Sequence, residues 1–278
     1  MHVLIAGCGY VGTALGLRLA AEGHDVTGIR RSPERIPAPI RAVGADLTDP
    51  ATLDAVPPDV DAVVVTASAD GRDPDLYRAA YVDGPTTLLA FLAERGDPVR
   101  RVLFTSSSAV YGQADGELVD EDSPTEPSSP TGRILVEAER AVLDGPFPAT
   151  VLRLTGIYGP GRTRLVDQVR AGEATCGPGP DPTNRIHRDD CASALAHLLT
   201  LDDPADVYLG TDDDPAERCE VLTWLAAQVG APAPRVVEDG GSSRGNKRCS
   251  NARLRASGWA PTHPTFREGY AAMLAGEA

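Results

Sequence analysis

Short apolar runs alternate with longer segments of helical periodicity through the first half of the chain. Runs of four to six mostly apolar residues are typical of strands buried on both faces of a parallel sheet. They occupy residues 3–6, 25–29, 41–45, 61–66, 101–105 and 150–154. Amphipathic stretches predict helices at residues 11–22, 76–94 and 133–143. The alternation predicts an α/β fold whose parallel strands are joined by right-handed crossovers.

The pattern changes at two places along the chain. Residues 112–130 combine Pro, Ser, Asp and Glu without periodicity, and we expect a surface loop beside which functional residues gather. After residue 154 the alternation gives way to short elements. We therefore predict one domain at residues 1–155 and a smaller C-terminal lobe at 156–278, parts of which return to the first domain.

The turn after the first predicted strand carries a glycine motif. Gly7, Gly9 and Gly12, together with Tyr10 and Val11, fit the spacing G-x-G-x-x-G. Between a strand and a helix, these glycines permit a tight turn, close approach of a pyrophosphate and close packing of the helix. Backbone N–H groups and the positive helix end then bind phosphate. The motif predicts a Rossmann-type doubly wound sheet that binds a dinucleotide; a glycine-rich turn without a ligand is the alternative.

The end of the second predicted strand indicates which dinucleotide is bound. An acidic residue there would accept hydrogen bonds from the adenosine ribose, whereas arginine suits a 2′-phosphate. Arg30 and Arg31 occupy this place, which favours NADP over NAD, although two solvated surface arginines are the alternative. Further cofactor contacts are expected where the third and fourth strands end, from Asp46, Leu47, Thr66, Ala67 and Ser68. For Asp46, a helix cap is an equally good interpretation.

A hydroxyl-rich motif follows the fifth predicted strand. Residues 105–112 read Thr-Ser-Ser-Ser-Ala-Val-Tyr-Gly, and serines at the carboxyl end of a strand are placed to polarise a substrate carbonyl. With the glycine motif, residues 153–162 and residues 184–190, this motif resembles the extended short-chain dehydrogenase/reductases, the NAD(P)-dependent epimerase/dehydratase family. The resemblance implies that Ser107 is the catalytic serine. A serine that only caps the next turn is the alternative.

The sequence departs from this family at its catalytic Tyr-x-x-x-Lys pair. Thr131 stands in the place of the tyrosine and Leu135 in the place of the lysine. In the family, the lysine binds the nicotinamide ribose and lowers the pKa of the tyrosine, which then exchanges a proton with the substrate. Threonine does not titrate near neutral pH and leucine carries no charge. The chain therefore resembles the atypical members of the family.

Three functions are compatible with these residues. The first is an NADP(H)-dependent oxidoreductase or epimerase of small carbonyl or hydroxyl compounds, sugar-derived ones included. In this case Ser107 orients the carbonyl, and Tyr111, Tyr158 or His187 exchanges the proton, although His187 also fits a structural role. The second is a non-catalytic sensor or scaffold that holds NADP(H). The third is cofactor-assisted chemistry without net redox change, such as a dehydration.

Composition and charge limit the classes of molecule that the protein is expected to bind. The net charge of −14 disfavours nucleic acid and anionic membranes, and no apolar run is long enough to span a bilayer. The five cysteines lack the spacing of a zinc site or a disulfide framework, so we expect reduced thiols and no metal. We expect a cytoplasmic monomer or homodimer.

One basic segment stands out near the C-terminus. Residues 245–251 read Gly-Asn-Lys-Arg-Cys-Ser-Asn and contain Lys247, the only lysine in the chain. The segment is a candidate for neutralising an anionic group of the substrate. A helix-capping turn is the alternative.

Overall fold

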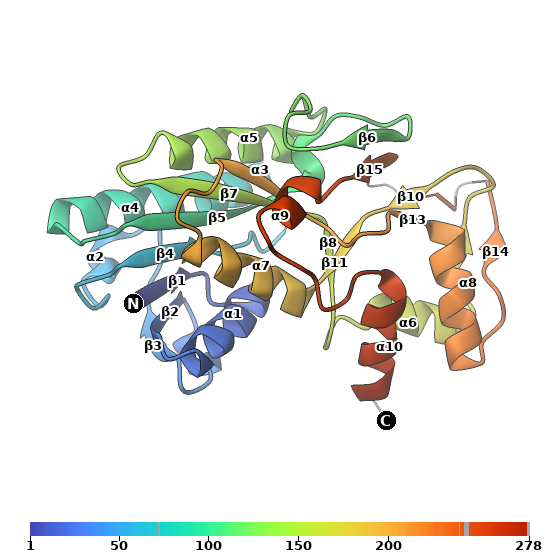
Figure 1. Cartoon of the computed structure of the whole chain (residues 1–278), viewed down its shortest axis with the longest axis horizontal. Helices are drawn as coiled ribbons and strands as arrows, with labels where there is room; N and C mark the ends of the chain where they lie inside the picture. The colour runs from blue at the N-terminus through green and yellow to red at the C-terminus, as the bar shows by residue number, and fades with distance from the viewer. Residues whose placement is uncertain (72, 239, 242–244, 277–278) are drawn as a thin grey trace.

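The computed structural model describes residues 1–71, 73–238, 240–241 and 245–276 (Figure 1). Its centre is a seven-stranded sheet in the order β12-β7-β5-β4-β1-β2-β3, and every neighbouring pair is parallel. The strands are β1 (His2–Ala6), β2 (Asp25–Arg30), β3 (Arg41–Gly44), β4 (Ala62–Val65), β5 (Arg101–Ser107), β7 (Ala149–Leu154) and β12 (Val207–Gly210). The predicted α/β fold with a parallel sheet is confirmed.

Helices cover both faces of this sheet. Leu15 of α1 (Tyr10–Ala21) and Leu195 of α7 (Arg188–Thr200) are buried in the core of one face. Leu88 of α4 (Gly84–Arg95) and Val142 of α5 (Pro130–Leu143) are buried in the core of the other, together with Leu53 of the short α2 (Pro50–Leu53). Figure 1 shows α1 and α7 in the lower part of the picture and α5 at the top, above β7. The sheet is therefore wound on both faces, as the glycine motif predicts.

The helix predicted at residues 76–94 consists of three consecutive segments. They are α3 (Pro74–Arg78), the π-helical η2 (Ala79–Asp83) and α4. Pro85, the second residue of α4, has no N–H to donate, and it directly follows the π-helical turn, where the regular α-helical hydrogen-bond pattern is already interrupted. The periodicity of the sequence predicts helical structure here, but it does not distinguish a π-helical turn from an α-helical one.

The surface loop predicted at residues 112–130 contains a short strand. This strand, β6 (Glu117–Val119), pairs in parallel with β15 (Lys247–Cys249) near the end of the chain. The basic segment at 245–251 thus contributes a strand, and its last two residues also lie at the start of a helix, α9 (Ala252–Ala256): Asn251 is the N-cap residue, and Ser250 accepts a hydrogen bond from the Ala252 N–H at 3.3 Å. Figure 1 shows the two strands side by side above the C-terminal lobe.

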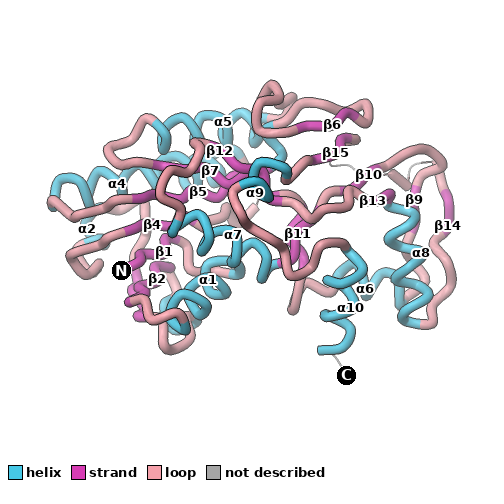
Figure 2. The backbone as a smooth tube through the Cα atoms, in the orientation of Figure 1, coloured by secondary structure: helices cyan, strands magenta, loops and turns pink. Residues whose placement is uncertain are grey.

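The C-terminal lobe is built from short elements joined by long loops (Figure 2). Two-stranded pairs form between β8 (Gly156–Tyr158) and β11 (Arg185–His187), β10 (Pro182–Thr183) and β13 (Ala216–Glu217), and β9 (Thr175–Cys176) and β14 (Arg235–Val236). The helices of the lobe are α6 (Arg164–Arg170), α8 (Arg218–Val229) and α10 (Phe266–Gly276), whereas α9 (Ala252–Ala256) packs through Leu254 into the core of the central sheet. Single 3-10 turns, η1 (Pro33–Arg35) and η3 (Ser108–Val110), lie in the N-terminal half. Val166, Leu225 and Phe266 join α6, α8 and α10 in the lobe's own core.

Segments after residue 155 also belong to the central sheet. Strand β12 is its edge strand beside β7, and α7 packs against α1. The boundary at residue 155 therefore does not separate all the residues of the two cores. In the described part of the chain, every helix is too short or too polar to cross a membrane.

Two cysteines of the lobe form a disulfide. Cys176 of β9 and Cys219 of α8 are bonded, with their Cα atoms 5.3 Å apart. The expectation of five reduced thiols is wrong for this pair, because the fold brings together two positions that lie 43 residues apart in the sequence. Cys8, Cys191 and Cys249 are free thiols and are buried.

Candidate functional site

The glycine motif forms a tight turn between β1 and α1. Gly7 has a φ of +82°, and a Cβ atom there would lie 2.3 Å from the Cα of Ala67. A Cβ atom on Gly12 would lie 2.9 Å from Cγ2 of Ile5, so this glycine permits the close packing of α1 on the sheet. Gly9 differs from both, because a Cβ atom there would meet only the Gly7 carbonyl oxygen, at 3.7 Å. The backbone at Gly9 is thus open to a ligand.

A cavity of about 640 Å³ opens above this turn. It lies at the carboxyl ends of the central strands, where ligands bind in open parallel sheets. All the predicted cofactor residues except Gly12 line it: Gly7, Gly9, Tyr10, Val11, Arg30, Arg31, Asp46, Leu47, Thr66, Ala67 and Ser68. The open backbone at Gly9, the N-terminus of α1 and the basic side chains at the far wall fit a nicotinamide dinucleotide.

Polar side chains at the adenosine end are partly engaged with each other. Arg31 pairs with Asp70, and both side chains are largely exposed. Asp46 accepts hydrogen bonds from the Thr48 N–H at 3.0 Å and hydroxyl at 2.8 Å, which lower the pKa of its carboxyl. Asp46 thus caps its own loop and also lines the cavity.

The serine motif at residues 105–112 lies between two cavities. One is the cavity above the glycine turn, which we call the dinucleotide cavity, and the other is a second cavity described below. Ser107 ends β5, accepts a hydrogen bond from the Ala109 N–H at 3.2 Å and lines the first cavity. Ser108, the first residue of η3, lines the second cavity. Ser106 is buried and donates to Glu139 at 2.6 Å. The neighbouring residues Ser107 and Ser108 therefore line different cavities.

Tyr111 does not reach either cavity in the described structure. Its side chain is buried, and its hydroxyl accepts a hydrogen bond from Arg153 at 3.0 Å. Arg153 in turn forms a buried ion pair with Glu139 at 2.7 Å. Burial raises the pKa of Tyr111 to about 12. In this placement the Tyr111 hydroxyl contacts Arg153, and its role in proton exchange stays a prediction.

The positions of the family's tyrosine and lysine lie at the start of α5. Thr131 is half-buried, and its hydroxyl lies 3.5 Å from that of Ser129, the N-cap residue of the helix. Leu135 is buried beside Val110 and Tyr111. Neither residue is among those that line the two cavities of the described structure. No titratable group therefore comes from this turn.

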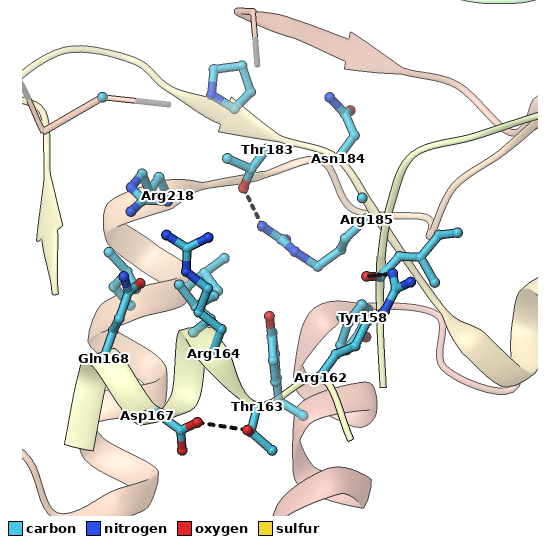
Figure 3. A pocket seen from close by; sticks show the side chains of 18 of the residues that line it. Tyr158, Arg162, Thr163, Arg164, Asp167, Gln168, Thr183, Asn184, Arg185 and Arg218 are labelled. Carbon is cyan, nitrogen blue, oxygen red and sulfur yellow. Dashed lines mark hydrogen bonds between the residues drawn. The ribbon is translucent and has the colours of Figure 1, made fainter. Parts of the chain in front are cut away.

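The second cavity has a volume of about 1350 Å³ and a basic wall (Figure 3). Five basic residues line it, against two acidic ones, Asp167 and Glu173. The basic residues are Arg162, Arg164, Arg185, Arg218 and Lys247. For a chain with a net charge of −14, this local balance is the reverse of the overall one.

Three arginines from separate elements converge in this cavity. Figure 3 shows Arg164 of α6, Arg185 of β11 and Arg218 of α8 directed to the same space. Arg185 is 7% exposed; it donates to the Thr183 hydroxyl, and its Nη1 has no hydrogen-bond partner within the described residues. The sequence analysis assigned no role to these arginines, although Arg185 lies in the motif at residues 184–190, because they come together only in the fold.

His187 occupies a structural position. Its Nδ1 accepts a hydrogen bond from the Asp189 N–H at 3.3 Å, and its ring lies 3.9 Å from that of His263. Burial lowers the pKa of His187 to about 4, so the ring is neutral. Asp190 could complete a metal-ligand set with these two histidines, but its carboxylate already accepts hydrogen bonds from the Thr262 N–H and from His263. The arrangement secures the N-terminus of α7.

Comparison with known proteins assigns the chain to a family. The model of the NAD dependent epimerase/dehydratase family matches residues 3–210. The chain belongs to this family. The match confirms the resemblance inferred from the glycine and serine motifs, and with it the expected class, an NAD(P)-dependent oxidoreductase or epimerase.

Individual members of the family resemble the whole chain. The 3-diazoavenalumate denitrifying reductase of a Streptomyces species is 31% identical over 301 aligned residues, which cover 97% of this chain and 99% of that protein. A Methylobacillus flagellatus structure described as an NAD-dependent epimerase/dehydratase is 37% identical, with a TM-score of 0.81 over 99% of this chain and 98% of that one. MoeE5, solved in complex with UDP-glucuronic acid and NAD, is 26% identical, with a TM-score of 0.81 over 98% and 97% of the two chains.

Proposed function

We propose that this protein is an NADP(H)-dependent oxidoreductase or epimerase that acts on a small anionic carbonyl or hydroxyl compound, sugar-derived compounds included. The observation that carries the proposal is the meeting of two cavities at one turn. Ser107 lines the cavity above the glycine turn, and Ser108 lines the basic one. Ile157 and Arg162 line both cavities, so a substrate and a dinucleotide bound in them would be neighbours.

The preference for NADP(H) rests on Arg30 and Arg31. Both line the dinucleotide cavity near Asp46, and guanidinium groups match a phosphate with paired donors. Arg31 now pairs with Asp70 at the surface, where an exposed ion pair contributes little stability, so a 2′-phosphate can replace this carboxylate at small cost. When bound, the nicotinamide supplies or accepts a hydride.

The basic cavity supports an anionic substrate. The Nη1 of Arg185 is buried without a hydrogen-bond partner among the described residues, which is unfavourable, so an anion bound beside it would supply the missing acceptor. MoeE5, which binds the anionic UDP-glucuronic acid, shares the fold. We infer that the arginines hold a carboxylate or phosphate of the substrate, while Ser107 and Ser108 orient the reacting oxygen.

A catalytic role is favoured over a sensor or scaffold. A sensor needs no second binding site, whereas the cavity beside Ser108 is large, polar and basic. Chemistry without net redox change, such as a dehydration, would use the same two cavities. Identification of the reaction product distinguishes it from an oxidation or reduction. The expected monomer or homodimer and the cytoplasmic location stay predictions.

The proposal is tested by cofactor titration followed by a substrate screen. We expect NADPH to bind at least tenfold more tightly than NADH at moderate salt, and the double variant R30Q/R31Q to lose this difference. The matched control is Arg100→Gln, which replaces an exposed arginine outside both cavities.

The screen monitors NADPH oxidation with carbonyl compounds that carry a carboxylate or phosphate, and product analysis of UDP-glucuronic acid and UDP-glucose. Turnover of at least one anionic compound, lost in Arg185→Gln, is the expected result. Tight NADPH binding without turnover or product throughout the screen would instead support the sensor.

A further inference from the structure

The only lysine of the chain is buried in the wall of the second, basic cavity, which we call the substrate cavity. Lys247 is the first residue of β15 and is 5% exposed. Its backbone carbonyl accepts a hydrogen bond from the Asn184 side chain at 2.8 Å, which ties the strand to the wall that carries Arg185. Lysine is rarely buried without a charged partner. The burial of Lys247 therefore needs an explanation.

The surroundings of Lys247 do not neutralise its charge. Its Nζ donates to the backbone carbonyl of Tyr111 at 3.5 Å, and it forms no ion pair with the residues that the structure describes. Glu117 lies opposite it on β6 but is exposed, and the Cys249 thiol on its own strand is buried with a raised pKa. Neighbouring Arg248 is held by Glu217 at 3.0 Å. Burial lowers the pKa of Lys247 below its ordinary value.

The contact with Tyr111 places this ammonium group beside the serine turn. Tyr111 closes η3, and its N–H donates to the Ser108 carbonyl at 3.3 Å. Ser108 and Lys247 line the same cavity, and Ser107, one residue earlier, lines the dinucleotide cavity. A 3-10 turn rises about 2 Å per residue, so the backbone of Ser108 lies on the order of 6 Å along the turn from Tyr111, whose carbonyl Lys247 contacts.

The other titratable candidates are poorly suited to proton exchange. Tyr111 is held by Arg153, and His187 is buried and neutral outside both cavities. Tyr158 lines the substrate cavity, but burial raises its pKa far above the ordinary value. Lys247 combines a proton that it can release with a position in the cavity wall.

We propose that Lys247 contacts the reacting oxygen of the substrate and exchanges a proton with it, in place of the residues absent at positions 131 and 135. In the direction of reduction, the ammonium group gives one proton to the carbonyl oxygen as that oxygen gains negative charge, and an O–H bond forms. The neutral amine left behind takes a proton from solvent. In the direction of oxidation, the amine accepts the hydroxyl proton. The assignment rests on the proposed function.

Because the chain has a single lysine, an amine reagent tests this placement without turnover. The probe is pyridoxal 5′-phosphate, an aldehyde that carries a phosphate. An accessible amine attacks the aldehyde carbon and releases water, and borohydride then reduces the imine to a stable secondary amine. Mass spectrometry locates the pyridoxyl group on a peptide and distinguishes Lys247 from the N-terminal amine.

We expect saturable labelling of Lys247 that UDP-glucuronic acid suppresses and that Arg185→Gln weakens at least fivefold. The matched control, Arg100→Lys, adds an exposed amine outside both cavities, and its labelling should be insensitive to UDP-glucuronic acid. Labelling of the added amine in R100K without labelling of Lys247 would overturn the placement. Labelling of Lys247 that no anion suppresses would also overturn it.

The proton transfer is tested by two variants of Lys247, using the compound that the screen identifies. Lys247→Arg keeps a cation that does not titrate, so we expect kcat to fall by about 100-fold or more while KM changes less than threefold. Lys247→Met should impair both. In the wild type, kcat for reduction should fall as pH rises through the pKa of Lys247, and K247R should lack this fall. Full kcat in K247R would show a role in charge alone and refute the proton transfer.

The proposed function and the assignment of Lys247 fail on different results. If nothing is turned over although NADPH binds, the proposed function fails, and the labelling still decides whether Lys247 presents an amine to an anionic carbonyl. If turnover is found but Lys247 is not labelled, the proposed function stands and the assignment of Lys247 fails.

Discussion

At the scale of single residues, the three motif glycines carry different constraints. Gly7 is fixed by a positive φ and by contact with the backbone of Ala67, and Gly12 by packing on Ile5. Gly9 meets no comparable obstacle within the protein. We attribute the glycine at this position to the space that a bound pyrophosphate would need.

Gly9→Ala should therefore separate binding from folding. We expect NADPH affinity to fall at least tenfold, because the methyl group occupies the face of the turn that the phosphates approach, while the unfolding temperature shifts by only a few degrees. Gly7→Ala should instead lower the unfolding temperature strongly. Calorimetric titration and thermal unfolding measure the two effects, and unchanged NADPH affinity in G9A would contradict this account of the turn.

Asp212 predicts a measurable pH dependence of stability. Burial raises its pKa to about 8, although the nearby charge of Arg185 acts in the opposite direction. The ordinary pKa of an aspartate is about 3.9, so between these pH values the folded protein holds a proton that the unfolded chain lacks. The stability that this proton contributes is present at low pH and is lost as pH rises towards 8.

The variant Asp212→Asn should therefore gain stability relative to the wild type as pH rises from about 4 to about 8. The gain is at most about 1.4 kcal/mol per pH unit, the value for one proton. Urea unfolding at several pH values measures it, with the exposed Asp202→Asn as the control. Parallel pH profiles for D212N and the wild type would show that Asp212 titrates normally.

At the scale of elements, the sequence predicted the helices and strands whose own residues show a clear local pattern. Buried parallel strands such as β4, with its run of valines, have apolar residues at every position, and the glycine turn follows β1 directly. Strands β6 and β15 have three residues each, include charged residues and pair across more than a hundred residues of sequence. Neither pattern nor spacing indicates such a pair, so the sequence singled out Lys247 as a basic candidate without showing that it shares a cavity with four arginines.

The disulfide joins β9 to α8 beside Arg218, which lines the basic cavity. A crosslink that closes a loop of this length stabilises a fold by about 2–4 kcal/mol. We expect three free thiols in the denatured, unreduced protein and a lower urea midpoint after reduction. The double variant C176S/C219S should be insensitive to the reductant, and a wild type equally insensitive to it would contradict the crosslink.

At the scale of the whole molecule, the two halves of the sequence are not two independent bodies. Helix α7 and strand β12 come from beyond residue 155 but belong to one face and one edge of the central sheet. We expect a fragment of residues 1–155 to expose the apolar side of α1 and to unfold without cooperativity. A fragment of residues 1–210, which restores both elements, should unfold cooperatively and bind NADPH. Circular dichroism and NADPH fluorescence distinguish the two, and a cooperative 1–155 fragment would contradict this view.

The parallel pairing of β6 with β15 has a consequence for the order in which a nascent chain matures. On a ribosome, the central sheet can close once β12 has emerged, so the dinucleotide cavity is complete before the last quarter of the chain is synthesised. The wall that carries Lys247 forms only when β15 reaches β6. A translation intermediate would thus hold its cofactor before it could engage a substrate.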